Sequence, residues 1–288
     1  MELTNSKEIR ELLGRHGFRF SKSMGQNFLT AAWVPESIAE GAGLDRDTGV
    51  LEVGPGIGCL TEQLSKRAGK VVSVELDKAL KPVLAETLRD CGNVELIFGD
   101  VLKQDLPTLV KEHLPGLRPV VCANLPYNVT SPLLTAFLRA DCFDSITVMI
   151  QREVARRICA APGSGEYGAF GLFVQWHTEP ELLFDVPPSC FVPQPKVTSS
   201  VIRLRRRERS PVPVEDEKLM FKIIRAAFNQ RRKTLGNALS SGLGLNKDET
   251  EQILEKCGFD TRIRGEILDI GSFAKISDEI GRVLSPDL

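Results

Sequence analysis

Short runs of apolar residues alternate with longer amphipathic segments through the first half of the chain. Runs rich in Val, Ile and Leu predict strands at residues 49–53, 70–75, 94–98, 120–123 and 145–150. Between the strands, apolar residues recur at helical spacing, most clearly over residues 60–67 and 78–89. Such alternation is typical of a mostly parallel sheet with helices on both faces. We therefore predict an α/β fold for this part of the chain.

The pattern changes after Glu208. Residues 210–217 read SPVPVEDE, a composition that is typical of a linker. Helical spacing with little strand signal then recurs over residues 218–229, 250–257 and 273–283. We expect a first domain over residues 1–208, with an N-terminal extension that has a helix near residues 6–16. A smaller helical domain is expected over residues 209–288.

The charges of the chain almost cancel. There are 37 Lys and Arg against 38 Asp and Glu, for a formal net charge of −1, so the total does not indicate a polyanionic partner. Basic residues still cluster in two places, one with Arg203, Arg205, Arg206, Arg207 and Arg209, the other with Arg231, Arg232 and Lys233. Local basic patches can bind phosphate. Equally, the first cluster is typical of a strand that leaves a sheet, and the second of a solvated helix face.

The cysteines and the composition of the N-terminus indicate the cellular compartment of the protein. The 7 cysteines are scattered without a Cys-x-x-Cys pair and without histidine at ligand spacing. They predict free thiols in a reducing compartment, with neither a disulfide framework nor a metal site. No apolar stretch approaches bilayer-spanning length, and the first residues include Glu2, Glu8 and Glu11, which a targeting peptide would avoid. We expect a cytoplasmic protein that does not enter a membrane.

A glycine-rich loop follows the first predicted strand. Gly54, Gly56 and Gly58 lie between that strand and a predicted helix, where the backbone can approach a ligand closely. The loop does not fit the dinucleotide fingerprint, because its third glycine would fall at Cys59. On its own the loop is weak evidence, since a tight strand-to-helix turn has the same composition.

Two acidic residues end the next two strands and strengthen the prediction of a ligand. Glu75 ends the second strand, and a carboxylate there can accept hydrogen bonds from both hydroxyls of a ribose. Asp100 follows the third strand, where it can accept from the amino group of adenine. Ligands bind at the carboxyl ends of strands in open α/β sheets. A GxGxG loop with these acids favours S-adenosylmethionine as the cofactor.

The tetrapeptide Asn124-Leu125-Pro126-Tyr127 follows the fourth strand. An exocyclic amine on a base is a poor nucleophile, because its lone pair is delocalised into the ring. The Asn124 side-chain oxygen and the Leu125 carbonyl can each accept one N–H and align the lone pair for in-line displacement. Pro126 fixes the turn, and Tyr127 offers a ring on which an extruded base can stack. The alternative is a simple turn with a packed tyrosine.

With these motifs the chain resembles the ribosomal RNA adenine dimethyltransferases, and among them the bacterial enzymes that dimethylate two adjacent adenosines near the 3′ end of small-subunit ribosomal RNA. The resemblance covers nearly the whole length. It includes residues 25–29 (GQNFL), 52–58 (EVGPGIG), 124–127 (NLPY) and 191–197 (FVPQPKV). It implies a Rossmann-like seven-stranded methyltransferase sheet with a smaller all-helical C-terminal domain.

The resemblance also implies roles for single residues. The implied cofactor contacts are Asn27, Leu29, Gly54, Gly56, Glu75, Asp100, Val101 and Asn124. The implied catalytic group is Asn124, Leu125, Pro126, Tyr127 and Phe191, in which Phe191 supplies a second aromatic face for the adenine. For Arg231, Arg232 and Lys233 it favours contact with RNA phosphates. The implied partner is small-subunit ribosomal RNA within a partly assembled subunit, and a monomer is our default.

Three alternatives are set against this interpretation. Large-subunit adenine methyltransferases of the macrolide-resistance type share the glycine loop and the tetrapeptide, but residues 228–235 (FNQRRKTL) and 264–268 (RGEIL) resemble the small-subunit enzymes. Leu125 points the same way more weakly. A non-catalytic ribosome-assembly factor would not need the two cofactor acids together with Asn124. A DNA adenine methyltransferase would need a target-recognition insertion, for which the helical tail leaves little room.

Overall fold

The computed structural model describes residues 2–18 and 26–284. The chain divides into two compact units. The first comprises Met1–Ala155 and Glu179–Arg206, and the second comprises Arg156–Thr178 and Arg207–Leu288.

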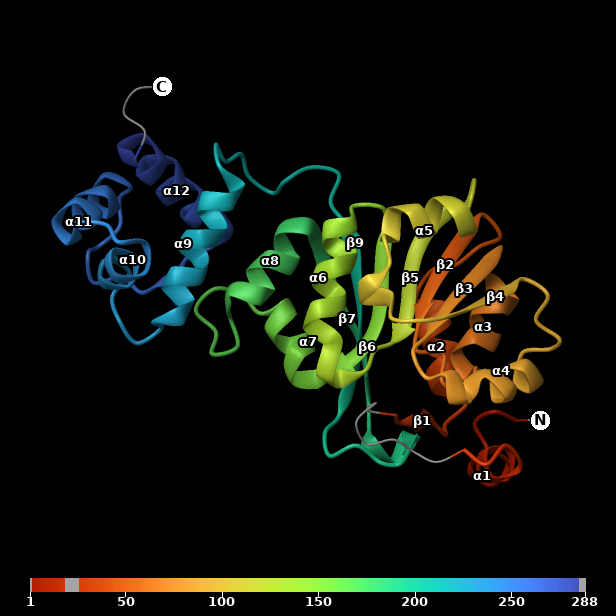
Figure 1. The fold of residues 1–288 in the computed structure, drawn as a ribbon. Helices are drawn as coiled ribbons and strands as arrows, with labels where there is room; N and C mark the ends of the chain where they lie inside the picture. Colours follow the sequence, from red (N-terminus) through yellow and green to blue (C-terminus); the bar gives the residue numbers. More distant parts are fainter. Residues whose placement is uncertain (1, 19–25, 285–288) are drawn as a thin grey trace. The chain divides into compact units, whose positions relative to one another are not determined.

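Within the described residues, the first unit is built on a seven-stranded sheet in the order β4-β3-β2-β5-β6-β9-β7 (Figure 1). Its strands are β2 (Thr48–Val53), β3 (Lys70–Glu75), β4 (Val94–Phe98), β5 (Arg118–Asn124), β6 (Ser145–Gln151), β7 (Thr178–Val186) and β9 (Ser199–Arg206). Strands β4, β3, β2, β5 and β6 pair in parallel, whereas β9 is antiparallel to β6. The predicted α/β fold is confirmed, and all five predicted strands are present.

Helices precede and connect the parallel strands, as the alternation of patterns predicts. They are α2 (Trp33–Gly41), α3 (Cys59–Arg67), η2 (Lys78–Leu80), α4 (Lys81–Thr87), η3 (Val101–Lys103), α5 (Leu106–His113), η4 (Tyr127–Val129) and α6 (Thr130–Ala140). Apolar residues of α2 and α3, such as Ile38 and Leu64, are buried in one cluster with Val50 and Val71 of the sheet. This core holds the strand ends that carry the acidic residues and the tetrapeptide.

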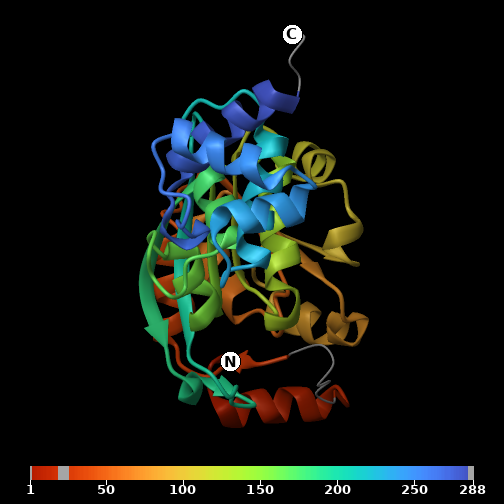
Figure 2. The ribbon, with the colours of Figure 1, turned by 90° about the vertical axis from the view of Figure 1, so that its left-hand side faces the viewer.

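The N-terminal extension packs beside the first unit's glycine loop. Helix α1 (Ser6–Arg15) buries Ile9 and Leu12 in a cluster with Phe28, Ile57 and Leu84. Strand β1 (Phe28–Leu29) pairs antiparallel with β8 (Phe191–Val192), which follows η5 (Pro188–Cys190), and Figure 2 shows β1 beside this distant segment. The extension is therefore held by both a helix and a strand pair.

The second unit is helical. It contains α8 (Ala169–His177), α9 (Glu217–Asn229), α10 (Leu235–Leu243), α11 (Lys247–Lys256), η6 (Gly265–Ile267) and α12 (Ile270–Leu284), and α7 (Arg152–Cys159) runs into it from the first unit. The boundary expected after residue 208 assigns residues 156–178 to the first domain, but these residues pack with the C-terminal helices. The physical reason is that Tyr167 and Trp176 are buried in one core with Phe273, and the Tyr167 hydroxyl donates to the Leu268 carbonyl at 2.9 Å.

Candidate active site

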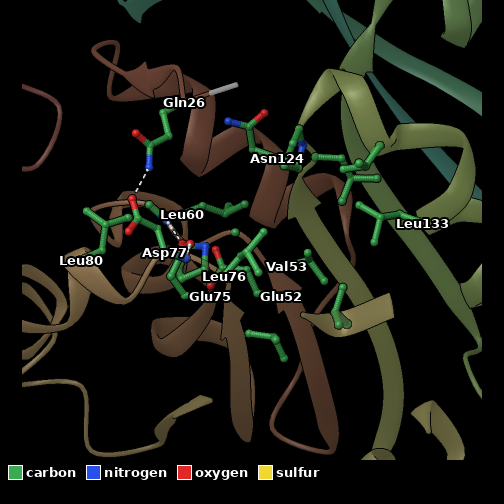
Figure 3. A pocket seen from close by; sticks show the side chains of 18 of the residues that line it. Gln26, Glu52, Val53, Leu60, Glu75, Leu76, Asp77, Leu80, Asn124 and Leu133 are labelled. Carbon is green, nitrogen blue, oxygen red and sulfur yellow. Dashed lines mark hydrogen bonds between the residues drawn. The ribbon is translucent and has the colours of Figure 1, made fainter. Parts of the chain in front are cut away.

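One pocket lies at the carboxyl ends of β2, β3, β4 and β5 (Figure 3). Parallel strands present these ends at one edge of the sheet, which is where open α/β sheets bind ligands. The predicted residues that line it are Asn27, Leu29, Gly54, Gly56, Glu75, Asp100, Val101, Asn124, Leu125, Pro126 and Tyr127. The structure thus brings together the glycine loop, both strand-end acids and the tetrapeptide. Gly25, the first residue of the GQNFL motif, lies outside the described residues.

The glycine loop needs glycine for its backbone shape. Gly54, Gly56 and Gly58 all have positive φ, at 70°, 61° and 92°, a region that other residues enter only at a cost. A Cβ atom at Gly56 would also lie 3.1 Å from the Phe28 ring. The loop therefore turns sharply from β2 into α3 and leaves its backbone exposed to the pocket.

Glu75 is held in place by two backbone donors. The N–H of Asp77 donates to one carboxylate oxygen at 2.8 Å, and the N–H of Gly56 donates to the other at 3.3 Å. Only 6% of the residue is exposed. Burial raises the pKa of Glu75, and the two backbone donors oppose this rise. Each oxygen retains acceptor capacity that a ribose hydroxyl can use.

Asp100 shapes the next part of the pocket. Its carboxylate accepts from the N–H of Leu102 at 3.0 Å and so caps η3. Two exposed leucines, Leu76 and Leu102, also line the pocket, with exposures of 54% and 42%. They offer apolar surface for a flat ring between two acids. Sequence reasoning missed both leucines, although each follows a predicted acid by one or two positions.

The tetrapeptide begins at the end of β5. Asn124 is the last residue of that strand, and the N–H of Leu125 continues the strand pairing by donating to the Met149 carbonyl at 3.1 Å. The hydroxyl of Tyr127 lies 2.6 Å from Oγ of Ser199. Burial raises the pKa of Tyr127, so its phenol is neutral at physiological pH. The turn therefore presents an amide and a neutral phenol ring at one wall of the pocket.

A buried carboxyl at the glycine loop was not predicted as a site residue. Glu52 lines the pocket but is only 1% exposed. One of its oxygens accepts from the hydroxyls of Ser73 at 2.6 Å and Thr61 at 2.7 Å. Burial raises the pKa of Glu52 to about 7, against the effect of these two donors. Its ionisation is therefore balanced near neutral pH.

Phe191 does not line the pocket, and its expected role as a second stacking face stays a prediction. The residue is 1% exposed and belongs to the apolar core that includes Leu29 and Ile38. Its strand β8 pairs with β1, and Leu29 is its partner in the register. In this structure the Phe191 ring is therefore packed in the core beside the β1–β8 pair. The sequence pattern carried no sign of this pairing between distant segments.

The two basic clusters differ in their surroundings. In the first, Arg203 and Arg205 of β9 are paired with Glu181 of β7, at 2.7 and 3.1 Å. In the second, Arg231 donates to the Gly165 carbonyl at 3.2 Å and lies over the Phe228 ring. Its neighbours Arg232 and Lys233 are exposed between α9 and α10.

Other chemistry-bearing residues lie away from the pocket. His16 is 2.7 Å from Glu86, and His113 is 2.7 Å from Glu95. Over residues 2–18 and 26–284, no group of three or more His, Cys, Asp or Glu side chains could hold a metal ion. Across the same residues, no helix combines the length and apolar character needed to cross a bilayer.

Comparison with known proteins agrees with the geometry. The family model for ribosomal RNA adenine dimethylase matches residues 17–280. Ribosomal RNA small subunit methyltransferase A of Geobacillus thermodenitrificans is 46% identical over 284 residues, with 97% of each chain covered. The protein of the same name from Alkaliphilus oremlandii is 44% identical, with 98% of this chain and 99% of that one covered.

Two solved structures are also similar. A dimethyladenosine transferase from Plasmodium falciparum has a TM-score of 0.73 and 25% identity, with 86% of this chain and 95% of that one covered. The 23S rRNA methyltransferase ErmE has a TM-score of 0.68 and 26% identity, with 88% and 99% covered. With a family model that spans most of its length and relatives of this identity, the chain belongs to the ribosomal RNA adenine dimethylase family.

Proposed function

We propose that this protein transfers methyl groups from S-adenosylmethionine to the N6 amines of two adjacent adenosines near the 3′ end of small-subunit ribosomal RNA. Two methyl groups on each adenosine make four transfers in all. The observation that carries the proposal is the pocket in which the glycine loop, Glu75 and Asp100 meet the tetrapeptide from Asn124 to Tyr127. The reaction belongs to ribosome biogenesis, for which we propose a cytoplasmic location.

The pocket residues fit the cofactor. Glu75 would accept from the ribose hydroxyls, and Asp100 from the adenine amino group, because each carboxylate retains acceptor capacity beyond its backbone donors. Val101 and the exposed Leu76 would contact the adenine ring. The remaining contacts would come from Asn27, Leu29, Gly54, Gly56 and Asn124. When bound, the cofactor supplies an electrophilic methyl group on a positively charged sulfur.

Asn124 and Leu125 would hold the target amine. Two acceptors on its hydrogens draw the nitrogen toward tetrahedral geometry and direct its lone pair along the line of displacement. Pro126 fixes the turn that aims both acceptors, since its φ is constrained by the ring. The hydrogen bond that the N–H of Leu125 donates to the carbonyl of Met149 anchors the same turn to β6. The amine becomes acidic once it is methylated, so its proton can pass to water without a strong base.

Tyr127 would stack on the extruded adenine. A base must leave its helix before its amine can enter a pocket of this kind, and an aromatic face offsets part of the lost stacking. Phe191 is buried and would act through the core instead, by supporting Leu29 across the β1–β8 pair. In this proposal the ring of Tyr127 is the aromatic wall that serves the base.

Several observations favour small-subunit RNA over large-subunit RNA. The relatives at 44% to 46% identity carry the name small subunit methyltransferase, whereas the 23S rRNA methyltransferase is 26% identical. The helical second unit also supplies Arg232 and Lys233, exposed cations that could contact RNA phosphates. Arg231 would support this segment through its bond to Gly165. We propose a partly assembled small subunit as the substrate and a monomer as the active form.

The test is methyl transfer from labelled S-adenosylmethionine to small subunits that lack the modification, followed by mass analysis of the nucleosides. Dimethyladenosine in small-subunit RNA is the expected product. Transfer to large-subunit RNA instead would indicate a large-subunit adenine methyltransferase of the macrolide-resistance type. Absence of transfer to both would contradict the proposal and favour a non-catalytic assembly factor.

A further inference from the structure

A hydrogen bond joins the N-terminal segment to the far side of the pocket. The side-chain amide of Gln26 donates to Oδ2 of Asp77 at 2.8 Å, and Figure 3 shows this bond beside Glu75. Gln26 lies two residues before β1, and Asp77 lies two residues after the end of β3. Both residues line the pocket. The bond therefore links two segments that are distant in sequence at the edge of the cofactor site.

Asp77 is the centre of a short chain of hydrogen bonds. Its second carboxylate oxygen accepts from the N–H of Ala79 at 3.0 Å and caps η2. Its own N–H donates to Glu75 at 2.8 Å, and Gly56 donates to the other oxygen of Glu75. The orientation of the Glu75 carboxylate therefore depends on the position of the Asp77 backbone. That position is fixed from two sides, by the cap and by Gln26.

The N-terminal segment does not need this bond to stay in place. Phe28 is buried in the cluster that contains Ile57 and Leu84, and Leu29 pairs with Phe191 through the β1–β8 register. Loss of the Gln26 amide would thus leave the segment docked. Its effect would fall on the turn from Glu75 to Asp77, which the short η2 cap holds from the other side.

We propose that Gln26 is a positioning residue for the cofactor, which acts through Asp77 to hold Glu75 in the orientation that receives the ribose hydroxyls. The inference rests on the proposed function of the pocket and adds a residue to it. A carboxylate that is already oriented binds more tightly, because less conformational freedom is lost when the ligand arrives. The expected effect is therefore on affinity, with the rate at saturating cofactor nearly unchanged.

The variants Q26A, Q26E, D77N and Q26E/D77N test the bond. Binding of S-adenosylhomocysteine is measured by calorimetry, since this product has no sulfonium charge and responds weakly to a distant change of charge. We expect Q26A to raise the Kd about five- to tenfold, as the loss of one hydrogen bond would. Q26E should raise it further, because two carboxylates would face each other.

The double variant separates a specific bond from a general loss. In Q26E/D77N the amide introduced at position 77 can donate to the carboxylate introduced at position 26, and asparagine caps a helix as well as aspartate does. We expect its Kd to return to within about threefold of the unmodified protein's, a coupling that a double-mutant cycle measures. D77N alone should raise the Kd as Q26A does, because the amide introduced at position 77 would face the Gln26 amide donor. Q252E, an exposed change of the same charge on α11, is the control.

Kinetics and melting temperature complete the test. KM for S-adenosylmethionine should rise in Q26A and Q26E while kcat stays within about twofold, the signature of lost uniform binding. A merely structural role would lower the melting temperature and leave the Kd unchanged, which would overturn the inference. The inference would also be overturned if Q26E/D77N bound S-adenosylhomocysteine no more tightly than Q26E does. Failure of the unmodified protein to bind S-adenosylhomocysteine would overturn the proposed function as well.

Discussion

The hydroxyl of Tyr127 and Oγ of Ser199 lie 2.6 Å apart, so the aromatic wall of the pocket is tied to the first residue of β9. Ser199 is fully buried at the end of a strand that pairs with β6 along its length. A tyrosine ring held at its hydroxyl end can rotate less than a ring held only by its backbone. The serine therefore fixes the face that a stacked base would meet.

Ser199→Ala should slow methyl transfer without unfolding the protein. The variant loses one hydrogen bond, worth about 1 kcal/mol, which corresponds to roughly a fivefold fall in kcat/KM for RNA. Tyr127→Phe removes the same bond from the other side, so the double variant should be no worse than either single one. Tyr127→Ala should cost more, about 1–3 kcal/mol, because the stacking face is also lost. Additive effects of S199A and Y127F would contradict a shared bond.

Asn124→Ala should abolish methylation while the fold persists. The side chain lies at the open end of β5 and is not part of the apolar core, so the free energy of unfolding should change little. Without the amide oxygen, the target nitrogen keeps its planar geometry and its lone pair stays in the ring. Methyl transfer and thermal melting measured on the same preparation give both quantities. An active variant with normal melting would rule out the assigned role.

Phe191→Ala should act on stability more than on base capture. The ring is buried in the core, and truncation of a buried phenylalanine costs about 3–5 kcal/mol. Urea unfolding of Phe191→Ala and Phe191→Leu measures this, with the leucine variant expected to lose less because it leaves a smaller cavity. If Phe191→Ala unfolded normally but bound RNA poorly, the ring would have to leave the core and stack on the base.

The sequence allowed the parallel strands and most of the pocket to be predicted, because those signals are local. Runs of Val and Ile mark strands, and a residue that follows such a run must lie at the carboxyl end of the sheet. Glu75, Asp100 and Asn124 were found in this way, and all three line one pocket. The roles of these residues remain predictions that the variants above test.

The features that sequence reasoning missed depend on distant segments. Pairing of β1 with β8 buries Phe191, and packing of Tyr167 and Trp176 with Phe273 assigns residues 156–178 to the helical unit. Neither follows from a pattern within one window, because two-residue strands and single aromatic residues have no periodicity to detect. The Gln26–Asp77 bond belongs to the same class.

Stability should fall as the pH rises through the ionisation of Glu52. Its pKa is raised from 4.5 to about 7, so the folded protein retains a proton that the unfolded chain has released. Below about pH 4.5 the Glu52 carboxyl is protonated in both the folded and the unfolded protein, so no charge is buried on folding. Above about pH 7 the group is ionised in both, and burial of the charge lowers the free energy of unfolding by roughly 3 kcal/mol. Glu52→Gln should not show this decline, so its unfolding free energy relative to the unmodified protein should rise between pH 5 and pH 8. Parallel curves would show that Glu52 ionises normally.

Removal of Arg232 and Lys233 should weaken RNA binding in a salt-dependent way. Arg232 and Lys233 are exposed, and each phosphate contact releases counterions when RNA binds, so the double variant R232A/K233A should lower the slope of log K against log salt by about 2. Arg231→Ala should differ, since Arg231 is bonded to the Gly165 carbonyl and lies over Phe228. That variant should lower the melting temperature as well.

Binding of small-subunit RNA at several salt concentrations measures the slopes, and Lys247→Ala on α11, a cation within 3.6 Å of Glu251, serves as the matched control. An unchanged slope in R232A/K233A would mean that these side chains are solvated and contact no phosphate, and the RNA-binding surface would then have to lie elsewhere on the protein.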